Sequence, residues 1–563
     1  MRAKTLAMAI LPVALGLLPV TAGTAHAAAG TYYVSPSGSD SNSGLSPTQA
    51  WKTIAKVNGF TFPQGSLVYF EGGQTFTGCL VFNAKNVPSS SASTPFRVYS
   101  SGTGQATVKS NCTGASSAAV TADNVSGFQL NNLKVVNGGA TAAGVLLENQ
   151  TSSSATQGLT VSNSEISGFS TPSGSSSSFG GEIMVLGYAV NAHSGPLNHV
   201  QIIDNKLHGA SVTSADGPGI YGWGSGENIT DVTVQGNTIY NLGMPVKDLG
   251  AGVTADGWNG AVIQHNVIHD VGANVTSCGG ASGIETYTSN NVTVRYNEVY
   301  NVQPSPAFTA GCDWDGIDLD GGTSNSVVEY NYTHHNAGSG LLAYTSTVDS
   351  KVWGLNTFRY NISQNDDWGK IQGGLMDVVP SAPKNALSVY GNTFFTNNAQ
   401  TTKSSASACF DFGYSAGTWG SGSKVTDNIC DLADKDQSGH PGQFYYNPYG
   451  QTGMALSHNL YYTASSPTWR WGGTTYSSLA AWQAANLETK PIGGDPLLTS
   501  PGTGGTCPSS PTAGTGPQPC PQGYTLKSGS PALGAGAAVS GNGGVDYYQG
   551  AIPNPPNIGA DAG

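Results

Sequence analysis

The amino-acid sequence predicts an all-β solenoid in which short strands wind into about ten or more stacked coils. One short pattern containing Asn returns through the middle of the chain at nearly constant spacing. The segments between its copies are rich in Val, Ile, Thr and Tyr, and Gly, Asn and Ser separate them without any helical period. Only 10% of the 563 residues are charged, which excludes long charged helices and coiled coils.

The repeated pattern is an aliphatic residue, two polar residues, Asn, one further residue and then usually another aliphatic or aromatic residue. The Asn positions are Asn205, Asn237, Asn266, Asn297, Asn331, Asn361, Asn392, Asn428 and Asn459. Their intervals lie between 29 and 36 residues, which is too regular for loops and too variable for a fixed-length motif. We expect each Asn to occupy a sharp corner, to tolerate left-handed backbone and to bond the Asn above and below, without a catalytic role.

Stacking explains why such a pattern would fold. A single coil cannot bury its apolar side alone, whereas coils stacked ~4.8 Å apart form continuous parallel sheets around a dry core. The sequence therefore predicts a core that runs the length of the stack.

Residues 1–27 are predicted to be a signal peptide. A basic start, an apolar run from Leu6 to Val20 and the small residues of Ala25-His26-Ala27 are typical of an export signal, so the mature chain would begin near Ala28. No later segment approaches the ~18 apolar residues of a membrane span. The net charge of -12 disfavours nucleic acid as a partner. We expect a secreted, extracellular monomer.

Exported chains retain disulfides, and the eight Cys fall as neighbours along the sequence. We expect local pairing. The expected pairs are Cys79–Cys112, Cys278–Cys312, Cys409–Cys430 and Cys507–Cys520.

Three stretches of the chain carry a family resemblance. They are the opening Tyr32-Tyr33-Val34-Ser35-Pro36 followed by Trp51-Lys52-Thr53-Ile54, the coil repeat over roughly residues 120–465, and the ending Asp495-Pro496-Leu497-Leu498, Ser530-Pro531-Ala532 and Asn557-Ile558-Gly559-Ala560. Together they resemble the exported right-handed parallel β-helix proteins of the pectate lyase-like superfamily. That superfamily contains lyases, hydrolases, epimerases and binding proteins, so the fold does not choose the function.

We expect one continuous domain in three parts. Residues 28–115 would form an N-terminal cap with the first coils, and residues 116–470 the β-helix core. Residues 471–563 would form a last coil, a capping helix from Tyr476 to Leu487 and a disulfide loop. A capping segment would block edge-to-edge association of the open sheets.

A second register runs through five segments that begin with Gly and an aliphatic residue. The segments are Gly219-Ile220-Tyr221-Gly222-Trp223, Gly252-Val253-Thr254-Ala255-Asp256, Gly283-Ile284-Glu285-Thr286-Tyr287, Gly316-Ile317-Asp318-Leu319-Asp320 and Gly340-Leu341-Leu342-Ala343-Tyr344. Their second and fourth places would face the core, so their third and fifth places would face water. Four carboxylates would then share one sheet face with several aromatic side chains.

The next copy of this register begins near Gly374. An unchanged register would point Asp377 inward, which is unfavourable for a lone carboxylate. A slip of one residue turns Asp377 outward and places it beside Tyr344, and we expect this slip.

The acidic face predicts a glycoside hydrolase that cleaves a polysaccharide or oligosaccharide and needs no cofactor. Such a reaction requires one carboxyl group to protonate the leaving oxygen and another to activate water or attack the sugar. Crowding should make one member of the Glu285 and Asp318 pair the general acid. Asp320, with Asp256 across the gap, would stay ionised and position water. The expected substrate-binding residues are Tyr221, Trp223, Tyr287, the loop residue Trp314, Tyr344 and Asp377.

Two other functions stay open. Asp313, Asp315, Asp318 and Asp320 offer four oxygen donors within eight residues, enough to hold Ca²⁺. In β-helix polysaccharide lyases, the resemblance implies a metal that neutralises a uronate while Lys or Arg abstracts a proton. Lys and Arg are scarce here and none falls in the outward columns, so a Ca²⁺-dependent lyase ranks second. The third hypothesis is a non-catalytic glycan-binding or cell-surface protein.

His334 and His335 are adjacent in the sequence. Neighbouring side chains of a strand point to opposite sides, so we expect no metal shared between them.

Overall fold

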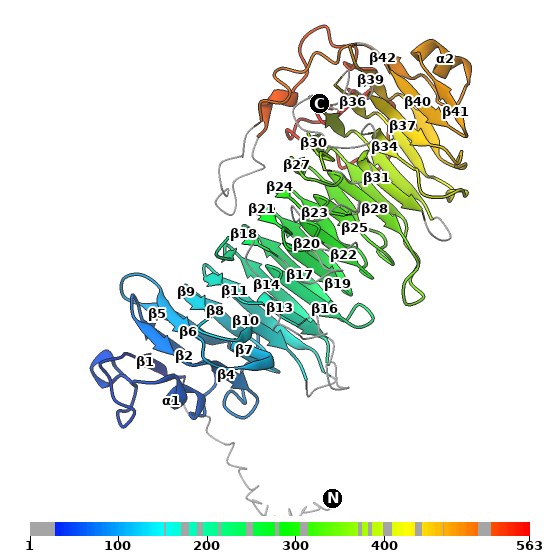
Figure 1. The fold of residues 1–563 in the computed structure, drawn as a ribbon. Coiled ribbons are helices and arrows are strands. Elements are labelled where there is room, and N and C mark those ends of the chain that lie inside the picture. The colour runs from blue at the N-terminus through cyan, green and yellow to red at the C-terminus, as the bar shows by residue number, and fades with distance from the viewer. Residues whose placement is uncertain are drawn as a thin grey trace, which may run out of the picture.

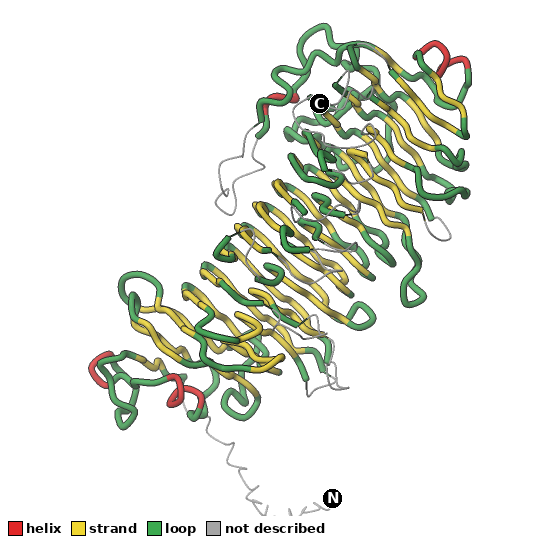
Figure 2. The backbone as a smooth tube through the Cα atoms, in the orientation of Figure 1, coloured by secondary structure: helices red, strands yellow, loops and turns green. Residues whose placement is uncertain are grey.

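A computed structural model describes most of the chain from residue 29 to its end (Figures 1 and 2). The described residues are 29–150, 154–170, 179–187, 195–211, 216–243, 251–275, 281–304, 313–369, 374–380, 385–397, 408–433, 442–464, 467–504 and 520–563. The predicted signal peptide lies outside them.

Each coil contributes one strand to each of three long sheets, which we call sheets A, B and C in the order the chain visits them. Within the described residues every sheet has fourteen strands, and the stack has about twelve turns. Figure 1 shows the strands running in parallel rows along the molecule. The prediction of an all-β parallel solenoid is confirmed.

The strand bounds follow the sheets. Sheet A contains β1 (Thr31–Val34), β2 (Leu67–Glu71), β5 (Phe96–Ser101), β8 (Phe128–Asn131), β11 (Thr156–Ser162), β14 (Leu197–Ile203), β17 (Ile229–Gln235), β20 (Trp258–Gln264), β23 (Thr293–Arg295), β26 (Val327–Glu329), β29 (Asn356–Arg359), β32 (Leu387–Tyr390), β35 (Lys424–Thr426) and β38 (Ala455–Ser457). Sheet B contains β3 (Thr75–Thr77), β6 (Ala106–Lys109), β9 (Leu133–Val136), β12 (Glu165–Ser167), β15 (Lys206–His208), β18 (Thr238–Leu242), β21 (Val267–Val271), β24 (Glu298–Val302), β27 (Tyr332–His334), β30 (Ile362–Gln364), β33 (Thr393–Phe395), β36 (Ile429–Asp431), β39 (Leu460–Tyr462) and β42 (Ile492–Gly493). Sheet C contains β4 (Leu80–Asn83), β7 (Gly114–Asp123), β10 (Thr141–Glu148), β13 (Gly181–Gly187), β16 (Ile220–Gly224), β19 (Val253–Asp256), β22 (Ile284–Tyr287), β25 (Ile317–Leu319), β28 (Leu341–Thr345), β31 (Gly374–Pro380), β34 (Ala408–Asp411), β37 (Gln443–Asn447), β40 (Thr468–Trp471) and β41 (Thr474–Tyr476).

The described residues contain two short α-helices, one near each end of the stack. Helix α1 (Ile54–Asn58) lies between β1 and β2, and α2 (Leu479–Ala484) lies between β41 and β42. The predicted helix from Tyr476 to Leu487 is therefore shorter than expected, because Ser478 caps the N-terminus of α2 by accepting from the Ala481 N–H. The chain also forms 3₁₀ turns at Pro47–Gln49 and Gln522–Tyr524. Among the described residues, neither α-helix has the length and apolar character that crossing a membrane requires.

Helix α2 packs against the C-terminal end of the core. Its Trp482 is fully buried and stacks on Trp469, with ring centroids 6.0 Å apart. The indole N–H of Trp482 donates to Glu488 at 2.8 Å. Trp482 therefore covers apolar surface at the last coil, and its indole N–H keeps a hydrogen-bond acceptor.

The nine repeated Asn form a continuous ladder at the turn between sheets A and B. Each is at most 2% exposed. For all of them except the last, Asn459, the backbone N–H and the side-chain Nδ2 both donate to Oδ1 of the Asn in the next coil, at 2.9–3.0 Å. The predicted bonding between stacked Asn is confirmed.

The left-handed backbone at this corner belongs to the residue before each Asn, which corrects our expectation. These preceding residues have φ between 52° and 68°, and they are Asp204, Gly236, His265, Tyr296, Tyr330, Tyr360, Gly391, Asp427 and His458. The preceding residue makes the bend, so the Asn side chain can turn inward and reach its neighbours. Asn is thus selected here for its amide rather than for its tolerance of positive φ.

Other polar side chains complete the ladder at its two ends. At the N-terminal end, the Ser164 N–H donates to Asn205 Oδ1, and the Ser164 hydroxyl accepts from the Leu133 N–H. At the C-terminal end, Glu488 accepts from the backbone and side chain of Asn459 and from the Tyr461 hydroxyl. The buried polar groups at both ends of the ladder therefore have hydrogen-bond partners.

Two of the predicted disulfides are present. Cys79–Cys112 joins the first coils, and Cys409–Cys430 joins sheets C and B near the other end. Cys278, Cys312 and Cys507 lie outside the described residues, so the other two pairings stay predictions. Cys520 is itself in a disulfide.

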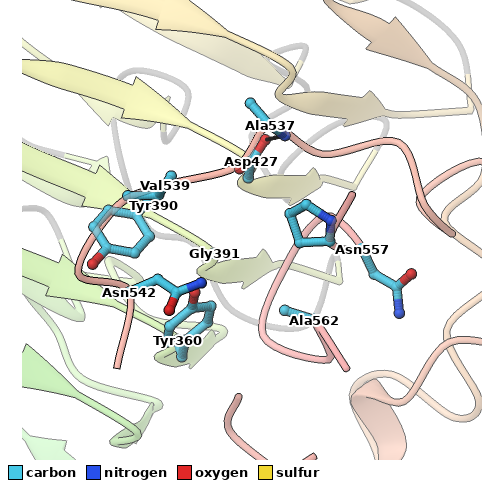
Figure 3. A pocket seen from close by; sticks show the side chains of 10 residues that line it. Tyr360, Tyr390, Gly391, Asp427, Ala537, Val539, Asn542, Asn557 and Ala562 are labelled. Carbon is cyan, nitrogen blue, oxygen red and sulfur yellow. Dashed lines mark hydrogen bonds between the residues drawn. The ribbon is translucent and has the colours of Figure 1, made fainter. Parts of the chain in front are cut away.

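The C-terminal segment 520–563 packs against the outside of the turn between sheets A and B. The Tyr330 hydroxyl donates to the Val545 carbonyl, and the Gly559 N–H donates to the Asp427 carbonyl. A small pocket of about 220 Å³, including space open to solvent, is left between Tyr360, Tyr390 and this segment (Figure 3). The segment thereby shields tyrosine rings that would otherwise face solvent.

We predict that Asn331→Ala destabilises the fold by on the order of 3 kcal/mol, because a buried donor left without its acceptor costs roughly 1–3 kcal/mol. The substitution removes the acceptor of two Asn297 donors. Urea unfolding followed by circular dichroism measures the effect. Asn198→Ala is the control. Asn198 on β14 is half-buried and lies outside the Asn ladder, and its side chain donates to the Thr230 hydroxyl. Equal unfolding midpoints for the two variants would contradict a supporting role for the ladder.

Candidate active site

Strand pairing in sheet C aligns the five Gly-led segments in the register that the sequence predicts. Glu285 on β22 is the direct partner of Asp318 on β25. Asp256 on β19 pairs with Trp223 on one side and with Tyr287 on the other. These strands are consecutive in the row labelled β16 to β28 in Figure 1. The carboxylates therefore occupy one wall of the solenoid.

Asp320 follows β25 directly and lies at the rim of this wall. Its backbone N–H donates to the Thr286 carbonyl at 2.8 Å, and its own carboxylate accepts from the Gly321 N–H. Asp320 is half-buried, so it is more accessible than Asp318, its neighbour two residues earlier.

The exposure of the wall differs from the expectation that both outward columns face water. Thr254, Glu285 and Asp318 in the third place are only 2–7% exposed, although they point away from the coil core. The fifth place is more open: Trp223, Asp256, Tyr287 and Asp320 are half-buried, and Tyr344 is 37% exposed. Pointing outward from a sheet did not make a side chain solvent-exposed, because neighbouring chain covers most of this face.

The third-place column continues beyond the segments that the sequence register identified. Asp377 on β31 pairs with Leu342, so the expected one-residue slip occurs. The expected position beside Tyr344 is wrong, because the strand partner of Tyr344 is Val379. The next strand adds Asp411, the direct partner of Asp377.

Asp411 was missed in the sequence because β34 has no leading Gly. An apolar residue followed by Asp, as in Met376-Asp377 and Phe410-Asp411, was the signal that could have found it. The same column then runs through Tyr446 to Arg470, whose guanidinium lies 5.2 Å from the Tyr446 ring. A cation thus does fall in an outward column, three strands beyond Asp377.

Burial and like charges keep protons on several of these acids. Burial, followed by the neighbouring Asp320 and Glu285, raises the pKa of Asp318 well above its usual range. Its Oδ1 is buried without a hydrogen-bond partner among the described residues. Folding therefore favours the protonated form of the Asp318 carboxyl.

Asp256 departs from the expectation that it stays fully ionised. Burial raises its pKa to about 7, with the Thr288 hydroxyl, which donates at 2.7 Å, opposing the shift. The positive charge of Lys351 also favours the ionised form. Lys351 belongs to a hairpin turn in which Val348 and Lys351 pair, and it forms an ion pair with Glu227 four coils away in the stack. The sequence had not indicated any cation at this rim.

Two of the predicted sugar-contacting aromatics are buried. Trp314 is 0% exposed, belongs to the main core cluster and donates its indole N–H to the Gly272 carbonyl at 3.2 Å. Its ring therefore offers no open face to a ligand. Tyr221 is 3% exposed, and its ring centroid lies 6.1 Å from that of Trp223. Of the predicted sugar-contacting aromatic residues, Trp223, Tyr287 and Tyr344 keep accessible surface.

The predicted Ca²⁺ ligands do not converge. Asp315 is buried and uses Oδ1 to accept from the backbone and hydroxyl of Ser339, at 2.7 and 2.5 Å. Burial raises the pKa of Asp315 to about 8, helped by the charge of Asp313. Within the described part of the chain, no group of three or more His, Cys, Asp or Glu side chains is arranged to hold a metal ion.

The two adjacent histidines meet instead of pointing apart. His335 has φ of 55°, which turns its ring back, and its Nδ1 lies 2.9 Å from Nδ1 of His334. His334 Nε2 lies 3.0 Å from the Glu298 carboxylate. The alternation expected of a regular strand fails here because the strand ends at His334.

Comparison with known proteins agrees with this architecture. A family model described as right handed beta helix region matches residues 190–430. Among curated proteins, the chain is similar to a lacto-N-biosidase of Bifidobacterium longum subsp. longum, with 28% identity over 180 residues that cover 30% of this chain and 10% of that protein. The chain thus spans about a tenth of the length of this relative.

Solved structures give distant matches. The GH136 lacto-N-biosidase from Eubacterium ramulus matches at 17% identity and a TM-score of 0.49, over 66% of this chain and 65% of that one. Pectate lyase Pel9A matches at 12% identity and a TM-score of 0.41, over 95% and 97% of the two chains. From the three sheets and the family-model match, we conclude that the chain has a right-handed parallel β-helix fold.

Proposed function

We propose that the protein is a secreted glycoside hydrolase whose reaction takes place on the outward face of sheet C. The observation that carries this proposal is the direct pairing of Glu285 with Asp318, beside the accessible Asp320. Hydrolysis of a glycosidic bond needs two carboxyl groups in different protonation states. Carboxyl groups crowded on neighbouring strands provide that difference, because they cannot all ionise together.

We assign the general acid to Asp318. A carboxyl group that holds its proton at neutral pH can transfer it to the leaving oxygen. Burial first, and then the charges of Asp320 and Glu285, raise the pKa of Asp318 and so favour its protonated form. Strand register contributes to this shift because it places Glu285 directly beside Asp318.

Activation of water or attack on the sugar is assigned to Asp320. It lies at the rim, where water and substrate can reach it, and it follows Asp318 by two residues on the same coil. Asp256 contributes a second rim carboxyl, although its pKa of about 7 leaves it only partly ionised at neutral pH. Tyr287 and Tyr344 offer ring surface on which a sugar could stack.

The similarity to a lacto-N-biosidase supports a glycosidase, while its short coverage leaves the sugar and linkage to experiment. Export is supported by the predicted signal peptide and by the two disulfides, since disulfides persist in oxidising compartments. We expect the mature protein to act outside the cell as a monomer.

We predict that Asp318→Asn lowers kcat by about 10²–10⁴-fold, the usual contribution of a general acid. The assay follows new reducing ends from a panel of polysaccharides and oligosaccharides, including substrates of lacto-N-biosidases. Asp231→Asn is the matched control, because Asp231 lies on sheet A and its side chain is 62% exposed. Full activity of the Asp318 variant would rule out this assignment.

Chelator treatment separates the hydrolase from the lyase hypothesis. A hydrolase that uses carboxyl groups alone should keep its rate in EDTA and release saturated products. Loss of activity in EDTA, together with an unsaturated product that absorbs in the ultraviolet, would favour the lyase. Binding without release of products from any saccharide would favour the non-catalytic hypothesis.

The buried acids also predict how stability depends on pH. In the folded chain the pKa of Asp315 is about 8, far above that of an exposed Asp, so folding favours the protonated form. Its contribution to stability is complete below the pKa of the unfolded chain and is lost as the pH rises through about 8. We therefore expect the thermal midpoint to fall between pH 5 and pH 9.

Asp315→Asn should weaken this dependence, because an amide does not titrate while its oxygen can still accept from Ser339. Calorimetry of both proteins at pH 5, 7 and 9 tests the prediction. Identical pH slopes in the two proteins would show that Asp315 titrates normally in the fold.

A further inference from the structure

A second pair of acids repeats the arrangement of Glu285 and Asp318 further along sheet C. Asp377 and Asp411 are direct partners on β31 and β34. Between the two pairs lies the strand that carries Leu342, which pairs with Asp318 on one side and Asp377 on the other. Two strand steps separate Asp318 from Asp377, which is roughly 10 Å at the usual strand spacing.

The second pair is held in place by neighbouring donors, and one of its oxygens is left over. The Tyr414 hydroxyl donates to Asp377 Oδ2 at 3.0 Å, and the Gly413 N–H donates to Asp411 Oδ1 at 2.5 Å. Asp377 Oδ1, in a side chain only 5% exposed, has no hydrogen-bond partner among the described residues. Buried polar atoms normally have hydrogen-bond partners, so we expect Asp377 Oδ1 to bond a group that the described residues do not provide.

Charge identifies the kind of partner. Burial and the adjacent Asp411, with Asp315 further off, keep the pKa of Asp377 well above its usual range, so folding favours the neutral carboxyl, which can both donate and accept. Sugar hydroxyls have the same double capacity. An anionic sugar would meet several acids at once, and no metal-holding group is found in the described part of the chain.

The face between the two acid pairs suits a sugar ring. Leu342 lies between the pairs and is itself 5% exposed, whereas Tyr344, two residues later, is 37% exposed and offers an accessible ring. Asp377 and Asp318 also resemble each other in burial, because each is 5% exposed and each has a buried Oδ1 without a hydrogen-bond partner among the described residues.

We propose that Asp377, Asp411 and Tyr414 form a second binding position, for a neutral sugar unit, so that the substrate is a neutral oligosaccharide lying along the coil axis from Asp318 to Asp411. This inference rests on the proposed function, because it takes the Asp318 end of the face as the place of cleavage. It adds the direction of the bound chain and the charge class of the substrate.

The test measures binding separately from cleavage. The Asp318→Asn protein, which should not turn over substrate, is applied to an array of neutral oligosaccharides and of oligogalacturonates of matched length. We expect neutral oligosaccharides to bind in preference to the acidic ones. Adding Asp411→Asn should weaken that binding at least tenfold.

The matched control adds Asp431→Asn to the same Asp318→Asn protein. Asp431 is likewise a buried Asp, 8% exposed, whose pKa is raised to about 7 mainly by burial, but it lies on sheet B. Its substitution should leave glycan binding unchanged. Thermal melts of all three proteins identify any variant that fails to fold.

Tyr414→Phe provides a gentler second variant, since it removes only the hydroxyl that orients Asp377. We expect it to weaken glycan binding at least threefold. If the Asp411 variant does not fold, the Tyr414→Phe result alone tests the second binding position. Undiminished binding in the folded variants, preference for oligogalacturonates, or no binding of any neutral saccharide would each overturn the second position. Wild-type cleavage with undiminished binding in the variants would overturn this inference alone, whereas absence of wild-type cleavage would overturn the proposed function.

Discussion

The buried Asn ladder is the constraint on which the rest of this structure depends. Many strands are only three or four residues long, so each offers few backbone hydrogen bonds with which to fix its register. In the coils from Asn205 to Asn459, the ladder adds two donors and one shared acceptor per coil inside the corner between sheets A and B. A slip of one residue would leave these buried groups unpaired and would turn every strand inside out. The ladder therefore supports the alignment of all three sheets, although no ladder Asn lies on sheet C.

Alignment on sheet C has a chemical consequence. Residues about thirty positions apart become direct neighbours, so that Glu285 meets Asp318 and Asp377 meets Asp411. Carboxylates placed together in this way would repel each other if ionised, and burial adds to that cost. Burial and like charges raise the pKa of Asp318 and Asp377, so folding favours their neutral forms, which lack this repulsion. The same crowding that would destabilise a set of ionised acids therefore favours a proton donor on this face.

Much of the architecture could be predicted from the residues alone, because it rests on local and periodic rules. The Asn spacing identified the coil, and the Gly-led segments gave the pairing of β16, β19, β22, β25 and β28 without error. The register was lost where coil length changed: Gly340 aligns with Leu375, and β34 lacks the leading Gly. Asp411 and Tyr414 escaped notice for that reason. The left-handed residue of the corner was placed one position late, because Asn satisfies the local preference equally well at either place.

The sequence by itself determined which residues share a column, since side-chain alternation and coil periodicity depend only on the order of residues. Only the tertiary structure decided which of them are covered, paired or protonated. Trp314 shows the difference. The sequence predicted a loop residue that contacts substrate, whereas packing against Gly272 from the preceding coil buries the Trp314 side chain completely. Asp256 shows the same for charge, because its proton affinity depends on Thr288 and on Lys351, which the fold brings from later coils. Burial and electrostatic fields sum over residues that are close in space, and a linear pattern contains no measure of that distance.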